Sequence, residues 1–156
     1  MDADELFFEN ETRKHQQEVA RLLMAVAQEL LERASWHDES KMREPERETF
    51  IRVTPQLRGL TYGSEEYHKK TKELGPALHH HYTHNRHHPE YFDLTNMHVG
   101  MNLVDAIEMF CDWMAATKRH DDGDIEKSIE HNQERFGYGP YFAALLRSTA
   151  EMLKNV

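Results

Sequence analysis

The sequence predicts an all-α protein, a single compact bundle of about five to seven helices in one domain over residues 1–156. Apolar residues recur at steps of three and four residues along most of the chain, which is the spacing of one helix face. No segment alternates apolar and polar residues as a half-buried strand does, and no hairpin signal is present. Glycine and proline separate the periodic segments, where they end one helix or begin the next. The length suffices for one domain with its own core.

The first predicted helix spans about residues 10–33, with Asn10 as its N-cap. Its apolar stripe has helical spacing and comprises Val19, Leu22, Leu23, Val26, Leu30 and Leu31. His15 lies four residues before Val19, so we expect its side chain to point inward with the stripe. The pattern Ser35-x-x-Asp38 then resembles a capping box and predicts the start of a second, short helix.

Later helices are predicted from their caps and from the prolines and glycines between them. Pro45 opens a helix that ends near Val53, because proline is favourable at the first helical position. Ser64 is expected to cap the next helix, through Glu73. Further helices are predicted at about residues 76–89, 102–119 and 124–136 and from residue 140 onward, with Asn102 and Asp124 as N-caps.

Composition narrows the classes of function. The formal net charge of -9 opposes binding to duplex nucleic acid, because such binding rewards a basic face. No run of about 18 or more apolar residues is present, so we expect no membrane span. A single cysteine, Cys111, fits a reducing cytoplasm, and the acidic start from Met1 to Glu5 differs from a secretory signal. We therefore expect a cytoplasmic protein, and a homo-oligomer is compatible with these features.

An adjacent imidazole and carboxylate stand at His37-Asp38, with Lys41 one turn later. Neighbouring residues on a helix point about 100° apart. Both side chains can therefore reach one metal ion only at a helix end, where this pair is predicted to lie. The alternative is that Asp38 only caps a helix and that His37 is solvated.

Six of the chain's twelve histidines lie between residues 79 and 88. On a helix their imidazoles form two neighbouring rows, one with His80, His84 and His87 and one with His81 and His88. Imidazoles that converge in this way suit Mn, Fe, Co, Ni or Zn. The alternative is a solvated polar face that binds metal adventitiously. No Cys-x-x-Cys or His-Glu-x-x-His pattern is present, which disfavours a zinc finger and a zincin protease.

Three carboxylates share one face of the helix predicted at 102–119, namely Asp105, Glu108 and Asp112. They are interleaved with apolar residues, where an unpaired carboxylate is costly. We expect Asp105 to bind metal, with Asp112 as the reserve. The alternative is a salt bridge to Lys118 or Arg119.

The order of these residues resembles that of the HD-domain metal-dependent phosphohydrolases, with a first histidine, a His-Asp pair, further histidines and a later aspartate. The resemblance implies an HD-like helical domain with the metal ligands His15, His37, Asp38, His80, His84, His87, His88 and Asp105. The motifs His-His-Tyr-x-x-Asn-x-His-His-Pro-Glu, Glu-Met-x-Cys-Asp-Trp-x-Ala-Ala and Arg-His-x-Asp-Gly-Asp resemble more closely a small family without an assigned activity. That family is associated with bacteria and their phages, which implies a bacterial or phage-infected cytoplasm.

Metal-assisted hydrolysis of a nucleotide or another small phosphate ester is the activity that the resemblance implies. One or two divalent ions of Mn, Fe, Co, Ni or Zn would activate a water and polarise a phosphoryl oxygen. Lys41, in the form His-Asp-x-x-Lys, and Arg86 would stabilise charge on the phosphate. Glu39 or Glu90 would orient the water or relay a proton.

Two other classes of function fit the same residues. A non-enzymatic, phage-type module would bind a small anionic ligand or a host protein. A non-haem di-iron oxygenase would hold two irons with the same ligand order. Mutation of the ligands separates the binding module from an enzyme, and metal identity separates the oxygenase from the hydrolase.

Overall fold

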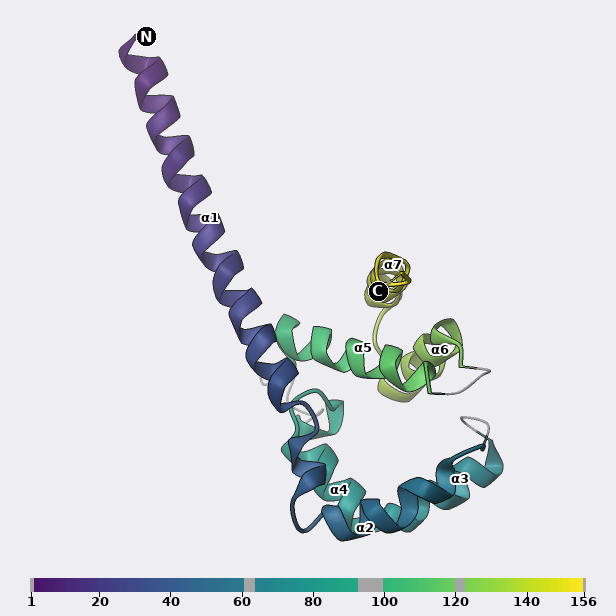
Figure 1. Ribbon diagram of the computed structural model, residues 1–156. Coiled ribbons are helices and arrows are strands. Elements are labelled where there is room, and N and C mark those ends of the chain that lie inside the picture. The colour runs from purple at the N-terminus through teal and green to yellow at the C-terminus, as the bar shows by residue number, and fades with distance from the viewer. Residues whose placement is uncertain (1, 61–63, 93–99, 120–122, 156) are drawn as a thin grey trace. The chain divides into compact units, whose positions relative to one another are not determined.

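The computed structural model describes residues 2–60, 64–92, 100–119 and 123–155. Its α-helices are α1 (Ala3–Trp36), α2 (Arg47–Val53), α3 (Glu65–Thr71), α4 (Gly75–His84), α5 (Leu103–Thr117), α6 (Ile125–Phe136) and α7 (Pro140–Met152), as Figure 1 shows. Short 3-10 turns are η1 (Glu39–Met42), η2 (Thr54–Leu57), η3 (Lys72–Leu74) and η4 (Pro89–Tyr91). The described ranges contain no strand, so the prediction of an all-α fold is confirmed. Contacts divide the chain into two units, Met1–His37 and Asp38–Val156, where the sequence predicted one domain.

The helix α1 forms the first unit and is longer than predicted. Asp2 is its N-cap, and the Asp2 carboxylate accepts hydrogen bonds from the backbone N–H groups of Asp4 at 2.7 Å and Glu5 at 3.1 Å. The prediction of Asn10 as the cap is therefore wrong, because the helix already includes it. Within this first unit by itself no residue of α1 is buried, and the prediction that its apolar stripe is a buried face stays a prediction. Across the described ranges, no helix is both long and apolar enough to cross a membrane.

The chain turns at Asp38, where we predicted the start of a helix. Ser35 is not a cap but lies within α1, and its hydroxyl donates to the backbone carbonyl of Glu32 at 2.6 Å. Asp38 has left-handed backbone angles (φ 61°, ψ 10°), and η1 follows it. The Asp38 side chain makes no capping hydrogen bond, so the reading in which it serves only as a helix cap does not hold.

The histidine-bearing helix α4 begins as predicted but ends at His84, well before Pro89. Asn85 follows in an extended conformation, and its side-chain amide donates to the backbone carbonyl of His81 at 2.8 Å. Asparagine competes in this way for backbone groups and favours helix ends. His87 and His88 consequently lie in the irregular segment after α4, and the helical rows that we predicted for them do not exist.

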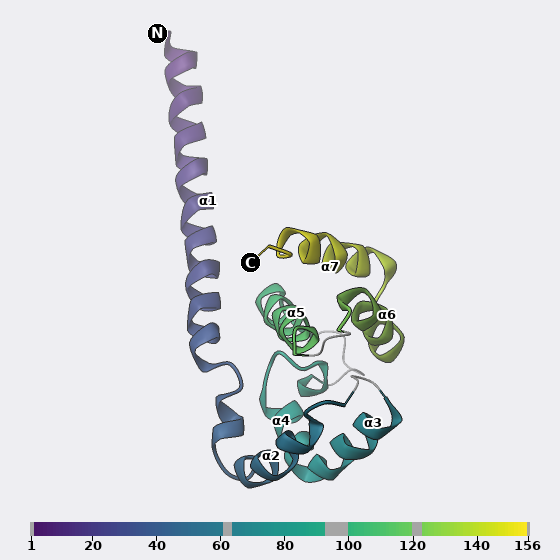
Figure 2. The ribbon, with the colours of Figure 1, turned by 45° about the vertical axis from the view of Figure 1, so that its right-hand side comes forward.

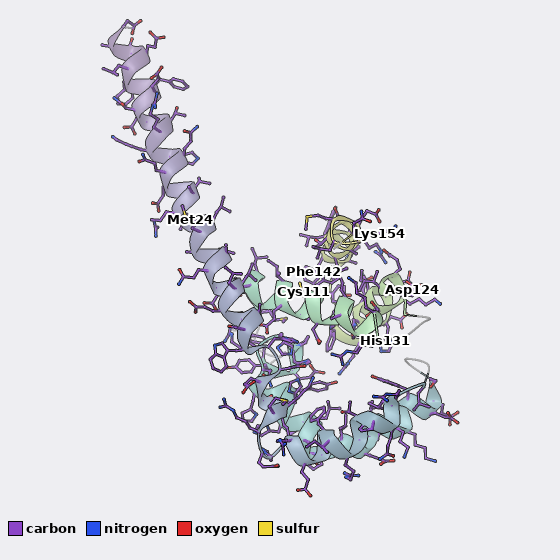
Figure 3. All side chains as sticks on the ribbon, in the orientation of Figure 1. Met24, Cys111, Asp124, His131, Phe142 and Lys154 are labelled. Carbon is purple, nitrogen blue, oxygen red and sulfur yellow. The ribbon has the colours of Figure 1, made fainter. Side chains whose placement is uncertain are left out.

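The later helices have the predicted caps. Asn102 and Asp105 form a capping box at the start of α5, and Asp124 caps α6 through the backbone N–H groups of its first turn (Figure 3). Gly137 ends α6 with a positive φ of 69°, a conformation that glycine adopts without strain. Ser64 likewise accepts a hydrogen bond from the backbone N–H of Tyr67 at 3.1 Å.

A small apolar core joins the last three helices. The helix α6 contacts both α5 and α7, and Figure 2 shows the three together. The buried core residues are Phe110, Ile129, Ala143, Leu146 and Ala150. The Tyr138 hydroxyl donates to the backbone carbonyl of Ile129 at 2.6 Å, which ties the end of α6 to this core.

Candidate metal centre

Four side chains of the second unit converge on one point. Asp38, His81, His87 and His88 each offer one ligand atom, and these four atoms lie within 4.8 Å of one another. His81 belongs to α4, His87 and His88 to the segment after it, and Asp38 to the turn before η1. His81 and His87 are buried, and the other two are half-buried.

Asp38 places one carboxylate oxygen among the imidazoles. Its Oδ1 lies 3.2 Å from Nε2 of His81 and 3.5 Å from Nε2 of His87, while its Oδ2 accepts from the Lys41 ammonium at 2.5 Å. Burial alone would raise the pKa of Asp38, but His81, His87 and Lys41 together outweigh it and hold the pKa well below its usual range. The carboxylate is therefore ionised at neutral pH.

His81 is oriented by a second carboxylate on its far side. Its Nδ1 lies 3.0 Å from Oε2 of Glu46, whose side chain is fully buried. Because a carboxylate can only accept, Nδ1 must carry the proton. A neutral His81 then has its lone pair on Nε2, the atom that faces Asp38.

His87 repeats this arrangement with a carboxylate from α5. Its Nδ1 lies 3.2 Å from Oε1 of Glu108, so the lone pair of a neutral His87 is also on the Nε2 that faces Asp38. Two lone pairs and a carboxylate oxygen repel one another unless a cation lies between them. A divalent metal ion held among these three atoms would meet this need.

His88 supplies a third imidazole. Its Nε2 is buried and has no hydrogen-bond partner among the described residues. Burial, followed by the neighbouring charges of His87 and His81, lowers the pKa of His88 to about 3. The ring is therefore neutral near pH 7, and its lone pair is available to a metal.

The donor set fits a divalent transition metal. In a tetrahedral site with metal–ligand bonds of about 2.0–2.2 Å, two ligand atoms lie roughly 3.3–3.6 Å apart. The separations of 3.2 and 3.5 Å between Asp38 Oδ1 and the two Nε2 atoms are close to these values. Three imidazoles and one carboxylate suit Zn, Fe, Mn, Co or Ni. The carboxylates behind His81 and His87 are the outer partners that metal-binding histidines commonly have.

The low pKa of His88 predicts a pH-dependent stability of the metal-free protein. The unfolded state gains a proton on this ring below about pH 6.5 and the folded state only near pH 3, so stability falls as the pH drops through this range. Between pH 7 and pH 5 the expected loss is about 2 kcal/mol. Urea unfolding with a chelator present measures it. A His88→Gln variant should lose less stability over this interval, and equal losses would show that His88 is not buried as a neutral base.

Two of the predicted histidine ligands do not join this cluster. The rings of His80 and His84 stack on each other with centroids 3.8 Å apart. His80 Nδ1 lies 2.7 Å from Glu46 Oε1, and His84 Nδ1 lies 2.8 Å from the backbone carbonyl of His80. Neither ring belongs to a described group of side chains able to hold a metal. Both residues lie on α4 as predicted, and their role as metal ligands stays a prediction.

The structure pairs Asp105 and Arg86, which were predicted as a metal ligand and a phosphate-binding residue. Arg86 Nε donates to Asp105 Oδ1 at 3.0 Å and Arg86 Nη2 to Oδ2 at 2.9 Å. This bidentate pair explains the complete burial of Asp105 without a metal. The same pair occupies Nε and Nη2 of Arg86, the guanidinium nitrogens that we expected to bind phosphate. Asp112, the reserve ligand, has a carboxylate oxygen within 4.8 Å of a ring nitrogen of His87.

The other predicted site residues lie in three places. Lys41 contacts the cluster through Asp38. Glu39 instead pairs with the guanidinium of Arg43 at 3.3 Å on an exposed surface, which does not favour a role for it in orienting water. His15 is exposed on α1, and His37 is the C-cap of that helix, so both belong to the first unit and their role as ligands stays a prediction.

Sequence reasoning missed His81 as a member of the candidate centre and Glu46 as the carboxylate beside it. His81 is the last of three consecutive histidines, His79 to His81, so nothing local distinguishes it from its neighbours. Its burial at 1% exposure separates it from His80, whose side chain is 32% exposed. A buried Glu46 has no signal in the sequence, because glutamate is almost always exposed.

The described residues define an all-α protein with a candidate centre of three histidines and one aspartate. The chain belongs to the family of unknown function DUF5662, whose model matches residues 4–156. No curated protein and no solved structure matches the chain. A family of unknown function brings no activity with it, so the function has to be argued from the geometry of the centre.

Proposed function

We propose that the protein is a metal-dependent phosphohydrolase that acts on a small phosphate ester, such as a nucleotide. The observation that carries the proposal is the convergence of His81, His87 and His88 on Asp38 Oδ1, with carboxylates behind two of the three rings. A divalent ion held there would lower the pKa of a bound water toward neutrality and polarise a phosphoryl oxygen. The resemblance to HD-domain phosphohydrolases supports the same chemistry.

Lys41 is the residue best suited to receive the phosphate. Its ammonium is held 2.5 Å from Asp38 Oδ2 and lies 5.4 Å from the centroid of the Phe50 ring, while its side chain keeps 29% exposure. A positive charge fixed beside the centre stabilises charge that develops on a phosphate oxygen. The net charge of -9 disfavours a long polyanion, so a small substrate is expected.

The test combines metal content with phosphate release. Untagged protein is analysed by elemental mass spectrometry, loaded with Mn, Fe, Co, Ni or Zn, and assayed on a panel of nucleotides and other phosphate esters. Lys41→Gln should retain the metal and lower kcat at least about tenfold. Lys154→Gln is the matched control, because Lys154 is 67% exposed near the C-terminus (Figure 3).

Each other result has a defined meaning. Bound metal without phosphate release from any substrate overturns the hydrolase and favours a binding role. Absence of bound metal after loading with each ion overturns the centre itself. Two equivalents of bound iron together with consumption of dioxygen would overturn the hydrolase proposal and favour a di-iron oxygenase.

A further inference from the structure

Glu46 is a fully buried carboxylate directly behind the candidate centre. Its Oε1 lies 2.7 Å from His80 Nδ1. Its Oε2 lies 3.0 Å from His81 Nδ1 and accepts from the Ser40 hydroxyl at 2.9 Å. Burial of a charged carboxylate is costly unless such donors satisfy it, and here both oxygens are bound. The site around Glu46 is therefore arranged for an ionised carboxylate.

The directions of the neighbouring hydrogen bonds follow from a count of donors. The Asn85 amide nitrogen has two hydrogens, which it can give to the His81 backbone carbonyl at 2.8 Å and to Ser40 Oγ at 2.9 Å. Ser40 then uses its own hydrogen toward Glu46. The Asn85 amide nitrogen also lies 3.0 Å from His81 Nδ1, but this contact is no hydrogen bond when Nδ1 carries a proton. The three donors that end at Glu46 are thus the Ser40 hydroxyl and the Nδ1 groups of His80 and His81.

We propose that Glu46 is a positioning residue of the metal centre, which keeps His81 in the tautomer whose Nε2 lone pair faces the metal. The inference rests on the proposed metal centre and deepens it. Because His80 and Ser40 bind the same carboxylate, Glu46 is fixed against rotation and holds the His81 ring with it. Its charge also makes His81 a stronger donor, so Glu46 sets both the affinity for the metal and the ligand field.

The two carboxylates behind the imidazoles, Glu46 and Glu108, are expected to differ in how strongly they affect metal binding. Glu108 stands behind His87 in the same way but keeps 14% exposure, so water can replace part of its contact. Glu46 is inaccessible to water and serves three donors. Loss of the Glu46 charge should therefore weaken the centre more than the same change at Glu108.

The experiment titrates the metal-free protein with Co²⁺ and records visible absorption. Glu46→Gln replaces one carboxylate oxygen by an NH₂ group, which donates hydrogen bonds. The side chain can then no longer accept at both Oε1 and Oε2. We expect its dissociation constant for Co²⁺ to rise 10- to 100-fold, as is typical for loss of an outer partner, and its absorption bands to shift. Glu130→Gln removes the same charge from an exposed site on α6 and should match wild type.

A wild-type measurement keeps the inference testable if Glu46→Gln fails to fold by circular dichroism. Long-range ¹H–¹⁵N spectra of the Zn²⁺-loaded wild type report which nitrogen of His81 carries the proton. A proton on Nδ1 is expected, and a proton on Nε2 overturns the inference. Unchanged affinity and bands in folded Glu46→Gln overturn it as well, while the metal centre stands. Failure of the wild type to bind Co²⁺ or Zn²⁺ instead overturns the proposed function.

Discussion

An Asp38→Asn variant is expected to bind divalent metal at least about 100-fold more weakly than wild type, beyond the 10- to 100-fold typical for loss of an outer partner. Asp38 is the one anion among the four donors that converge, and its Oδ1 lies closest to the two oriented imidazoles. An amide oxygen is neutral and a weaker ligand. The lost charge also removes the partner of Lys41, which leaves a cation beside the centre.

Asparagine is the appropriate substitution because of the backbone at this position. Asp38 has a positive φ of 61°, a region that asparagine and aspartate enter more readily than other non-glycine residues. Asp38→Asn therefore removes the negative charge of the side chain and leaves the backbone conformation of the turn unchanged. Asp38→Ala would add backbone strain of about 1–2 kcal/mol and confuse the two effects.

Calorimetric titration with Zn²⁺ and thermal unfolding with and without the metal check this prediction. Metal that binds only the folded state raises the melting temperature of wild type, and at the same metal concentration it should raise that of Asp38→Asn by less. His131→Gln is the control, because His131 is an exposed histidine on α6 (Figure 3). Wild-type affinity in Asp38→Asn would show that the metal binds elsewhere.

Removal of Arg86 is expected to destabilise the metal-free protein by about 1–3 kcal/mol. Asp105 is fully buried, and both of its oxygens are bound by the guanidinium of Arg86. Asp105 Oδ2 also accepts from the backbone N–H of Asn102, which closes the capping box of α5. Arg86→Ala leaves the carboxylate buried without its counter-charge, and that penalty exceeds the loss of the contact alone.

Two further variants separate charge from geometry. The guanidinium of Arg86 lies 5.3 Å from the ring centroid of Tyr91 and 5.1 Å from that of Phe92. Arg86→Lys keeps the charge but loses the bidentate fit and the stacking, so an intermediate loss is expected. Arg86→Ala combined with Asp105→Asn should be more stable than Arg86→Ala alone, because the buried charge is gone. Urea midpoints measure all three, and an Arg86→Ala midpoint equal to wild type would contradict this account.

Helix boundaries were predictable where a local interaction sets them. The capping box of Asn102 and Asp105, the cap at Asp124 and the end at Gly137 each involve atoms within about four residues of one another. The start of α1 was mispredicted because the acidic residues before Asn10 also form helix, with Asp2 as a better cap. The end of α4 was mispredicted because Asn85, and not Pro89, breaks it.

The sequence by itself determined that the protein is helical, where most helices begin, and that Asp38 and the histidines near residue 80 are candidates for one centre. The tertiary structure decided which of them meet. It selected His81 over His80 and His84, and it paired Asp105 with Arg86. The reason is physical: a cap is a contact between near neighbours in the chain, whereas a ligand's partner comes from another helix. Glu46, the N-cap of α2, and Glu108 of α5 lie beside His81 and His87 only because the tertiary fold brings these distant parts of the chain together.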